Sequence, residues 1–265
     1  MATDDLLVDD AGPVAVFSFN RPASRNALTP AMLAALADGI RGCAARDDLR
    51  AVVVRGAPGM PFSAGYDVDA LPDRPLDVAA ARAIHAPVRA VADAMLACPH
   101  PVIGAARKFV YGAALDLFCH CDLRLCAEGT TFSMPPNRYG FLYPDAGIHR
   151  MVDVAGMSRA TELFLLAQPM PAETALACGL VQRRSTDEGF ERDVAALCAA
   201  VAANAPLSMR GTKAALLRPR QDGGAPDAAA VERMYAAITA CLNSADVREG
   251  RDAFREKRPP RFAGR

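Results

Sequence analysis

Several features that would place a protein in a membrane or on nucleic acid are missing from this sequence. No run of about 18 apolar residues is free of charge, so no transmembrane helix is expected. Residues 1–10 are acidic and lack the basic-then-apolar order of a signal peptide, which predicts a cytoplasmic protein. The 30 basic and 30 acidic side chains cancel. This balance argues against nucleic acid or an anionic membrane as a partner.

Cofactor and metal motifs are missing as well. No G-x-G-x-x-G segment follows a predicted strand and there is no P-loop, so no cofactor is predicted. Of eight cysteines, Cys119, Cys121 and Cys126 lie close to His120. No second ligand pair stands at zinc-site spacing, and the run around these cysteines is mostly apolar. We therefore predict that they are buried and reduced, with no metal bound.

The chain does have the residues needed for a large core. It is 265 residues long and 52% apolar, which excludes a wholly disordered protein. Strand and helix signals alternate through the first part, and helical signals dominate the last. The predicted strands are 14–19, 52–56, 101–106, 123–126, 131–134 and 180–181, and the predicted helices are 30–45, 79–98, 112–121, 158–167, 172–178, 187–203, 206–217, 228–242 and 246–256.

This alternation predicts an α/β protein. Repeated βα units give parallel strands joined by right-handed crossovers. We expect a core in residues 1–200 and a helical region in residues 201–265 that packs on the core or on a neighbouring subunit. Within that region, the polar segment 218–227 is predicted to link two helices.

Two glycine-bearing turns are the places where chemistry is expected. One is FSAGYD at 62–67, after a buried strand, and the other is YGAALD at 111–116, which opens a helix. Free N–H groups at a helix start, together with the helix dipole, suit a developing negative charge. An N–H group from the first turn would complete an oxyanion hole. Taken alone, such turns are common at helix starts.

Four motifs in order carry a family resemblance. NRP at 20–22 with NAL at 26–28, then FSAGYD, then HPVIGAA at 100–106, then YGAALD resemble the crotonase family, the enoyl-CoA hydratase/isomerase superfamily. The resemblance implies a crotonase (ClpP-like) fold of repeated ββα units with a helical C-terminal trimerisation region. It also implies a small-molecule acyl-CoA substrate and a homotrimer or a dimer of trimers.

The resemblance assigns roles at the two turns. The backbone N–H groups of Tyr66 and Ala113 would hold the thioester carbonyl, although the family usually has glycine at the second position. Family hydratases use two glutamates, and the matching residues here are Asp116 and Pro136. Proline cannot act as a general acid or base, so the two-carboxylate hydration mechanism is in doubt.

Decarboxylation makes fewer demands on such a site. Segments 131–149 and 248–264 are similar to the methylmalonyl-CoA decarboxylase branch of the family. Loss of CO2 forms the enolate without a base, and two N–H donors stabilise it. Tyr143 matches a tyrosine that contacts the substrate and would orient the leaving carboxylate; the other interpretation is a turn tyrosine before Pro144. His149 matches too, with a structural role expected.

Other interpretations stay open. Asp145 stands where some family isomerases and a dehalogenase have a working aspartate, but it also suits a helix N-cap. Hydration or isomerisation through Asp116 or Asp145 is one alternative to decarboxylation. Because of Pro136, a non-catalytic CoA- or RNA-binding homologue is another. His85, His100 and His120 have no evident catalytic partner.

The resemblance also implies where the CoA part binds. Around the two turns, the matching positions are Arg25, Ala27, Ala64, Asp67 and Val68. In the terminal helix, Phe254 and Lys257 match residues that often reach the nucleotide of an adjacent subunit. The alternative for Arg25 and Lys257 is solvated surface charge.

Overall fold

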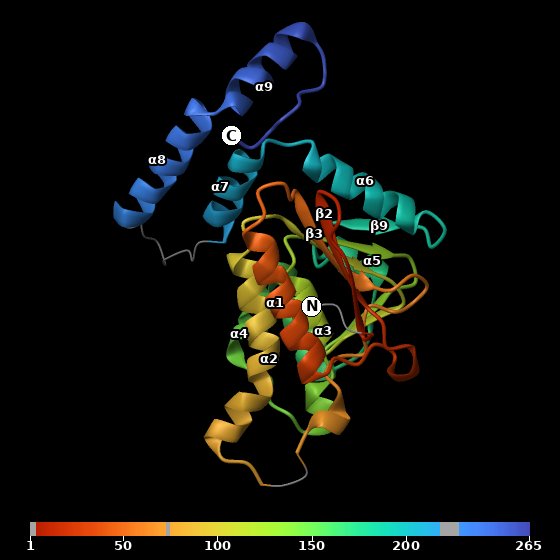
Figure 1. The fold of residues 1–265 in the computed structure, drawn as a ribbon. Helices are drawn as coiled ribbons and strands as arrows, with labels where there is room; N and C mark the ends of the chain where they lie inside the picture. Colours follow the sequence, from red (N-terminus) through yellow and green to blue (C-terminus); the bar gives the residue numbers. More distant parts are fainter. Residues whose placement is uncertain (1–3, 73–74, 218–227) are drawn as a thin grey trace.

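The protein is described from a computed structural model, which covers residues 4–72, 75–217 and 228–265 (Figure 1). Its main sheet has six strands within these residues. In order across the sheet they are β1 (Leu6–Asp9), β2 (Val14–Phe19), β3 (Ala51–Gly56), β4 (Val102–Ala106), β6 (Leu123–Ala127) and β9 (Arg183–Ser185). Apart from the antiparallel pair β1–β2, neighbouring strands run parallel. The predicted α/β class is confirmed.

A small second sheet lies next to the start of the third helix. Its strands are β5 (Phe109–Tyr111), β7 (Thr131–Ser133) and β8 (Met170–Pro171). The strands β1, β5 and β8 were not predicted, because they have only 4, 3 and 2 residues. The strand predicted at 180–181 is wrong. Leu180 and Val181 are buried, but the Val181 N–H bonds to the Ala175 carbonyl at 3.1 Å and closes a helix end. The strand forms at β9 instead.

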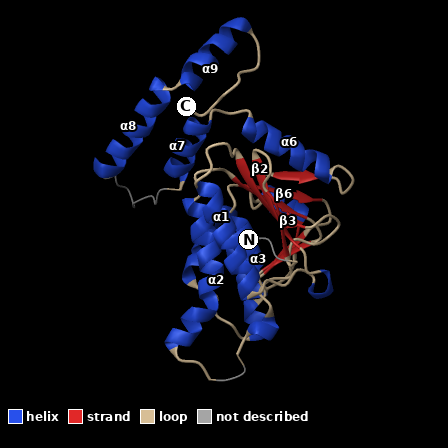
Figure 2. Cartoon of the chain, viewed as in Figure 1, coloured by secondary structure: helices blue, strands red, loops and turns tan. Residues whose placement is uncertain are grey.

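Helices cover both faces of the main sheet. In the core they are α1 (Pro30–Ala44), α2 (Val78–Ala97), α3 (Ala113–His120), α4 (Asp145–Thr161), α5 (Ala172–Ala177) and α6 (Phe190–Ala202). Alternate residues of β3 face opposite sides: Val52 and Val54 pack with α1 to α4, whereas Ala51 and Val53 pack with α6. Figure 2 shows α1 and α2 on one side of the sheet and α6 on the other. The predicted start of α1 is confirmed, since the Thr29 hydroxyl accepts the Met32 N–H at 3.2 Å.

The helix predicted at 158–167 is the end of a longer one. α4 begins at Asp145, is interrupted at Gly156 (φ 77°), and continues into a π-helical turn at Glu162–Leu166. A second glycine, Gly147, lies in its first turn. These glycines interrupt the apolar pattern, so the first part of α4 is not visible in the sequence.

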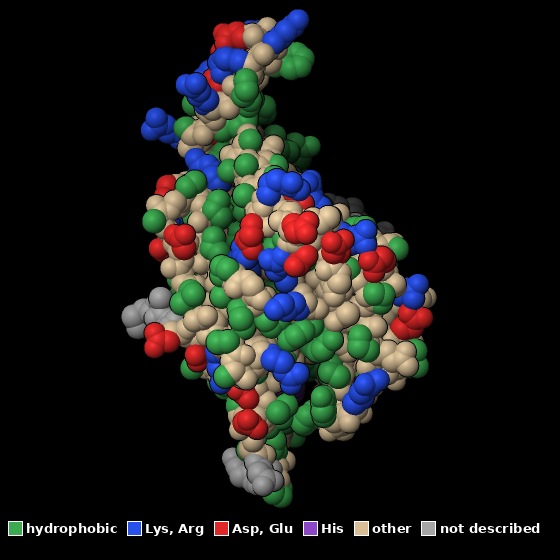
Figure 3. Space-filling model, turned by 90° about the vertical axis from the view of Figure 1, so that its right-hand side faces the viewer, with side chains coloured by type: hydrophobic (Ala, Val, Ile, Leu, Met, Phe, Trp, Pro, Cys, Tyr) green, Lys and Arg blue, Asp and Glu red, His purple; other side chains and the backbone are tan. Residues whose placement is uncertain are grey.

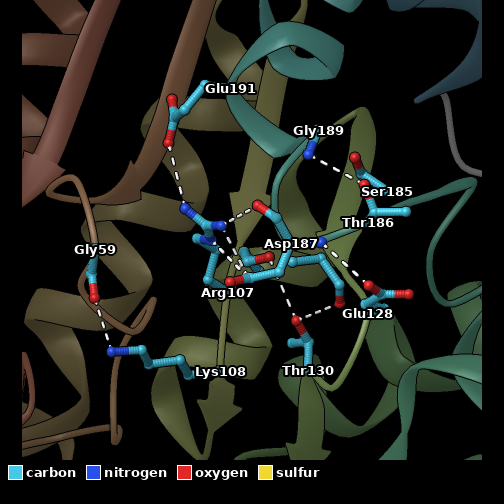
Figure 4. A network of polar contacts seen from close by, with 12 residues as sticks. Gly59, Arg107, Lys108, Glu128, Thr130, Ser185, Thr186, Asp187, Gly189 and Glu191 are labelled. Atoms are coloured by element: carbon cyan, nitrogen blue, oxygen red, sulfur yellow. Dashed lines mark hydrogen bonds and ion pairs between the residues drawn. The ribbon is translucent and has the colours of Figure 1, made fainter.

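A polar network ties α6 to the sheet (Figure 4). Arg55, in β3, forms two hydrogen bonds with Glu191, at 2.7 and 2.6 Å. Arg107, directly after β4, pairs with Asp187 at 2.8 Å. Both guanidinium groups lie over the Phe190 ring, at 5.7 and 4.9 Å from its centre. The network therefore fixes the start of α6 next to the strand ends.

The C-terminal helices extend away from the core (Figure 1). They are α7 (Pro206–Leu216), α8 (Ala228–Asn243) and α9 (Ala245–Glu256), and we call α8 and α9 the C-terminal arm. In α7, the buried Lys213 ammonium bonds to Asp122 at 2.7 Å and to the Met95 and His100 carbonyls. This contact holds α7 against the core, and α8 of the C-terminal arm packs on α7. The predicted link at 218–227 lies outside the described residues, and the division at residue 200 stays a prediction.

The cysteines near His120 are buried, as predicted. Burial raises the pKa of the Cys119, Cys121 and Cys126 thiols to about 12, so they are neutral at physiological pH. Cys119 contacts the Met151 sulfur at 3.7 Å.

In the part of the chain that the structure describes, no single helix is long and apolar enough to cross a membrane. There, only α6 and α7 together, bent by 101°, meet that length and composition.

Candidate active site

The two glycine-bearing turns lie against each other. Gly65 has φ +105°, and a Cβ atom there would come within 2.8 Å of the Tyr111 carbonyl oxygen and 3.6 Å of the Gly112 Cα. Gly112 has φ +55°. The Tyr111 N–H bonds to the Ser63 carbonyl at 3.1 Å. Only glycine fits this close approach without strain, and the FSAGYD loop is thereby held at the start of α3.

Two backbone N–H groups stand free at this junction. Hydrogen bonds between Leu28 and the neighbours of Tyr66, Gly65 and Asp67, fix the backbone on either side of Tyr66. Ala113 is the first residue of α3, so its N–H has no acceptor within the helix. Among the described residues neither N–H has a hydrogen-bond acceptor. Ala113 is not among the residues with positive φ, so alanine fits this backbone position without strain.

Asp116 lies one turn into α3 and bonds to Tyr143. The Tyr143 hydroxyl donates to Asp116 Oδ2 at 2.8 Å, and Asp116 is only 6% exposed. The Nδ1 atom of His120 lies 3.4 Å from Asp116 Oδ1 and 2.9 Å from the Asp116 carbonyl. Burial, the Asp116 charge and the hydrogen bond to Asp116 raise the pKa of Tyr143 well above its usual value. Tyr143 is therefore a neutral phenol at physiological pH.

The Tyr143 ring is enclosed on several sides. A Cβ atom on Gly147 would lie 2.4 Å from the Tyr143 ring and 3.1 Å from Asp116 Oδ2. Phe164, in the π-helical turn, and His85, in α2, have ring centres 6.1 and 6.4 Å from that of Tyr143. Partial burial lowers the pKa of His85. Sequence analysis found no partner for His85 because the contact joins two distant segments.

Pro136 and Asp145 belong to the elements on either side of Tyr143, a 3-10 turn before it and α4 after it. Pro136 is buried and opens a 3-10 turn, Pro136–Tyr139. Asp145 is exposed, and its Oδ1 accepts the Ala146 N–H at 2.8 Å. The N-cap of α4 is Pro144, so the N-cap interpretation of Asp145 is wrong by one residue. Asp145 lies in the first turn of α4, where the helix dipole stabilises a negative charge.

The positions matched to CoA fall into two groups. The Ala64 N–H bonds to the Arg25 carbonyl at 3.1 Å, and the Arg21 guanidinium bonds to both Asp67 and the Ala27 carbonyl, at 2.7 and 2.8 Å. Val68 follows Asp67 and is exposed, as is the Arg25 side chain. These five positions therefore share one wall beside the two turns.

Phe254 and Lys257 lie elsewhere in the chain. Phe254 is 84% exposed in α9, and Lys257 ends that helix. The arm points away from α3 (Figure 1), so a single chain does not bring these two residues to the turns.

Sequence analysis missed two residues that hold this wall. The buried Asn26 amide donates to the Pro61 carbonyl at 2.8 Å and accepts the Arg21 N–H at 2.7 Å. Arg21 also pairs with Asp67, as described above. Both residues belong to the NRP and NAL motifs, so the motifs themselves were the available signal.

The fold and the two turns indicate an enzyme of the class that acts on acyl-CoA, and comparison with known proteins agrees. The chain belongs to the enoyl-CoA hydratase/isomerase family, whose model matches residues 9–265. It is 30% identical over 252 residues to methylmalonyl-CoA decarboxylase of Escherichia coli (strain K12), covering 95% of each chain. It is 33% identical over 263 residues to "Probable enoyl-CoA hydratase echA6" of Mycobacterium tuberculosis (strain CDC 1551 / Oshkosh), covering 97% of this chain and 98% of the relative.

A solved structure confirms the expected crotonase fold. The crystal structure of an enoyl-CoA hydratase/carnithine racemase from Magnetospirillum magneticum is similar with a TM-score of 0.92 and 31% identity. The match covers 100% of this chain and 97% of that chain. The family is therefore established, and it contains proteins named for more than one reaction.

Proposed function

We propose that the protein is a lyase that removes CO2 from a methylmalonyl-type acyl-CoA, with no cofactor beyond the CoA of its substrate. The observation that carries the proposal is the single buried carboxylate beside the two turns. Asp116 is bonded to Tyr143, while the second acid/base position of family hydratases is the buried Pro136. A site with one carboxylate suits a reaction whose first step needs no base.

The proposed chemistry begins at the start of α3. The thioester carbonyl oxygen accepts hydrogen bonds from the Tyr66 and Ala113 N–H groups. As the bond to the carboxylate breaks, its electron pair moves into the thioester and forms an enolate. Each donor contributes about 3 kcal/mol to stabilising such an anion. The Tyr143 phenol would orient the leaving carboxylate out of the thioester plane.

The CoA part is proposed to lie along the wall described above. Arg25, Ala27, Ala64, Asp67 and Val68 would contact it from the same subunit. The partner for the C-terminal arm is proposed to be a second copy of the chain, in a homotrimer or a dimer of trimers. In that arrangement Phe254 and Lys257 reach the CoA of the adjacent subunit, which is consistent with their exposure in one chain.

Hydration or isomerisation is the second candidate. It is favoured by the likeness to a protein named as an enoyl-CoA hydratase and by a carboxylate, Asp116, in the first turn of α3. Mass analysis of products from methylmalonyl-CoA and, separately, crotonyl-CoA separates the two. Decarboxylation that persists in Asp145→Asn and falls in Tyr143→Phe supports our proposal. Crotonyl-CoA hydration that Asp116→Asn or Asp145→Asn abolishes, with methylmalonyl-CoA unchanged, contradicts it.

A non-catalytic CoA- or RNA-binding homologue is the remaining alternative. Acidic and basic side chains are interspersed over the face shown in Figure 3, which does not favour RNA. Calorimetry with acetyl-CoA and with a duplex RNA tests this directly. Tight RNA binding without a CoA signal would overturn the enzyme proposal.

A further inference from the structure

One oxygen of the Asp116 carboxylate is unsatisfied. Oδ2 accepts the Tyr143 hydroxyl at 2.8 Å. Oδ1 is buried and has no hydrogen-bond partner among the described residues, since His120 Nδ1 is 3.4 Å away and bonds to the Asp116 carbonyl. A buried carboxylate oxygen without a donor is costly. A proton on this carboxyl group would reduce that cost, because a neutral oxygen is less costly to bury than a charged one.

The pair also lies on the side of α3 that faces the oxyanion donors. Ala113 and Asp116 are three residues apart in one helix, so they share a face. Tyr143, bonded to Asp116, therefore lies on the side where the acyl group would enter. Gly147 leaves just enough room for the phenol, because a Cβ atom there would overlap both groups of the pair.

We propose that Asp116 and Tyr143 form a relay that supplies the proton needed by the α-carbon after CO2 leaves. This inference rests on the decarboxylation proposed above. That reaction consumes one proton per turnover, and the proposed oxyanion hole explains how the enolate forms but not how it is quenched. The relay provides a donor at the required end of the acyl group.

Substrate binding would add the proton that the relay delivers. In the free protein the Tyr143 hydroxyl donates to Asp116. A substrate carboxylate that accepts a hydrogen bond from Tyr143 would add a second negative charge close to Asp116. Two negative charges on either side of one phenol repel each other, more strongly in a buried site than in water. In the proposed relay, the Asp116–Tyr143 pair gains one proton from solvent as the substrate binds.

The other titratable and charged groups around Asp116 modulate this uptake. His120 and Cys119 face it from α3, and Tyr143 from the loop before α4. Arg89, in α2, also interacts with its charge, although Arg89 pairs first with Asp93 at 2.8 Å. Only Arg89 is a permanent cation in this set, and its own ion pair reduces its influence on Asp116.

The bonds and protons then balance. The C–C bond to the carboxylate breaks, CO2 leaves, and the electron pair forms the enolate. The Tyr143 O–H bond breaks as the new C–H bond forms at the α-carbon. The Asp116 O–H bond breaks as the Tyr143 O–H bond is restored. Asp116 returns to a carboxylate, and the protein has consumed one proton from solvent.

Calorimetry in buffers of different ionisation enthalpy tests the loading step without turnover. The probes are succinyl-CoA, which carries a carboxylate, and butyryl-CoA, which does not. We expect one proton to be taken up with succinyl-CoA and none with butyryl-CoA. Asp116→Asn should abolish the uptake while still accepting the phenol hydrogen bond, and the exposed Asp153→Asn change is the matched control. Undiminished uptake in Asp116→Asn would overturn the relay.

Kinetics with methylmalonyl-CoA test the delivery step. Asp116→Asn and Tyr143→Phe should each lower kcat roughly 100-fold or more, and the double variant should lose little beyond either single one. Losses that multiply in the double variant would also overturn the relay, with decarboxylation itself still standing. If the unaltered protein does not decarboxylate methylmalonyl-CoA, the proposed function fails first. The two failures are thereby distinguished.

Discussion

The start of α3 and the C-terminal arm are proposed to hold the same substrate, yet they are built in opposite ways. At the start of α3, two glycine turns meet through backbone contacts, and buried side chains such as Asn26 and Asp116 hold the loops around them. On the arm, Phe254, Leu242 and Tyr235 are 84%, 63% and 63% exposed. The first region is built within one chain, whereas the second presents apolar side chains that residues 4–72, 75–217 and 228–265 leave exposed.

This difference predicts which property a single substitution in each region should alter. A change at the turns alters geometry that the chain has already fixed, so it should affect chemistry even in an isolated subunit. A change on the arm alters a surface that is exposed in the single chain and that we propose a second copy covers. Its effect should appear in assembly and ligand affinity, with little change in the stability of the subunit itself.

The largest effect is expected at the contact between the two turns. In Gly65→Ala, the new Cβ atom would meet the Tyr111 carbonyl at 2.8 Å on a backbone with φ +105°. The loop must move, and a displacement of about 1 Å can cost roughly 100-fold in rate. We expect at least that loss in kcat. Steady-state kinetics with circular dichroism as a check on folding would measure it.

Gly42→Ala is the matched control for this change. Gly42 lies inside α1, and nothing is within 4 Å of a Cβ atom built there. Alanine should therefore keep full turnover and stabilise the helix by about 0.5–1 kcal/mol. A folded Gly65→Ala protein with the same kcat as Gly42→Ala would show that the close approach of the turns is not needed.

The next effect is expected where the arm joins the core. Lys213→Met removes the ammonium that pairs with Asp122 at 2.7 Å and leaves that carboxylate without its cation. Breaking a buried pair in this way costs about 3 kcal/mol. Chemical denaturation would measure the loss. The control is Lys108→Met, which removes an exposed contact to the Gly59 carbonyl and should change stability by less than about 0.5 kcal/mol.

A smaller effect is expected at the contacts around the Tyr143 ring. In Gly147→Ala, a methyl group would overlap the Tyr143 ring at 2.4 Å and push it away from Asp116. We expect kcat to fall about 10-fold, because a misplaced catalytic group loses rate steeply. Gly211→Ala, whose new methyl group would make an ordinary 3.7 Å contact, should not change kcat. Equal kcat values for the two variants would remove Tyr143 from the mechanism.

The sequence predicted features that depend on local signals and missed those that depend on contacts between distant residues. The two turns and the strand β3 before the first of them were predicted because glycine at 65 and 112 and a short apolar run are local signals. The Asp116–Tyr143 bond was not predicted, because it joins residues 27 positions apart. His120 could have been paired with Asp116 from their i, i+4 spacing in a predicted helix.

Short and polar elements were the other failures. The strand β9 has the sequence RRS, whose exposed arginines give no apolar signal. The helix α4 contains Gly147 in its first turn and is interrupted at Gly156, so the pattern of its first part resembles a loop. In both cases tertiary packing, and not local preference, determines the structure. The CoA positions depended on the family resemblance and stay predictions.

The smallest effect on the isolated subunit is expected from Phe254→Ala. The ring is 84% exposed, so its removal should change the free energy of unfolding by less than about 0.5 kcal/mol. If the arm packs on a second copy, the same change should weaken assembly and raise KM for the acyl-CoA, with kcat preserved in the assembled form. Sedimentation and kinetics over a range of protein concentrations would measure both. The exposed Leu7→Ala change, in β1, controls for the loss of any surface apolar group. If Phe254→Ala matches Leu7→Ala in assembly and in KM, the arm does not reach an adjacent site.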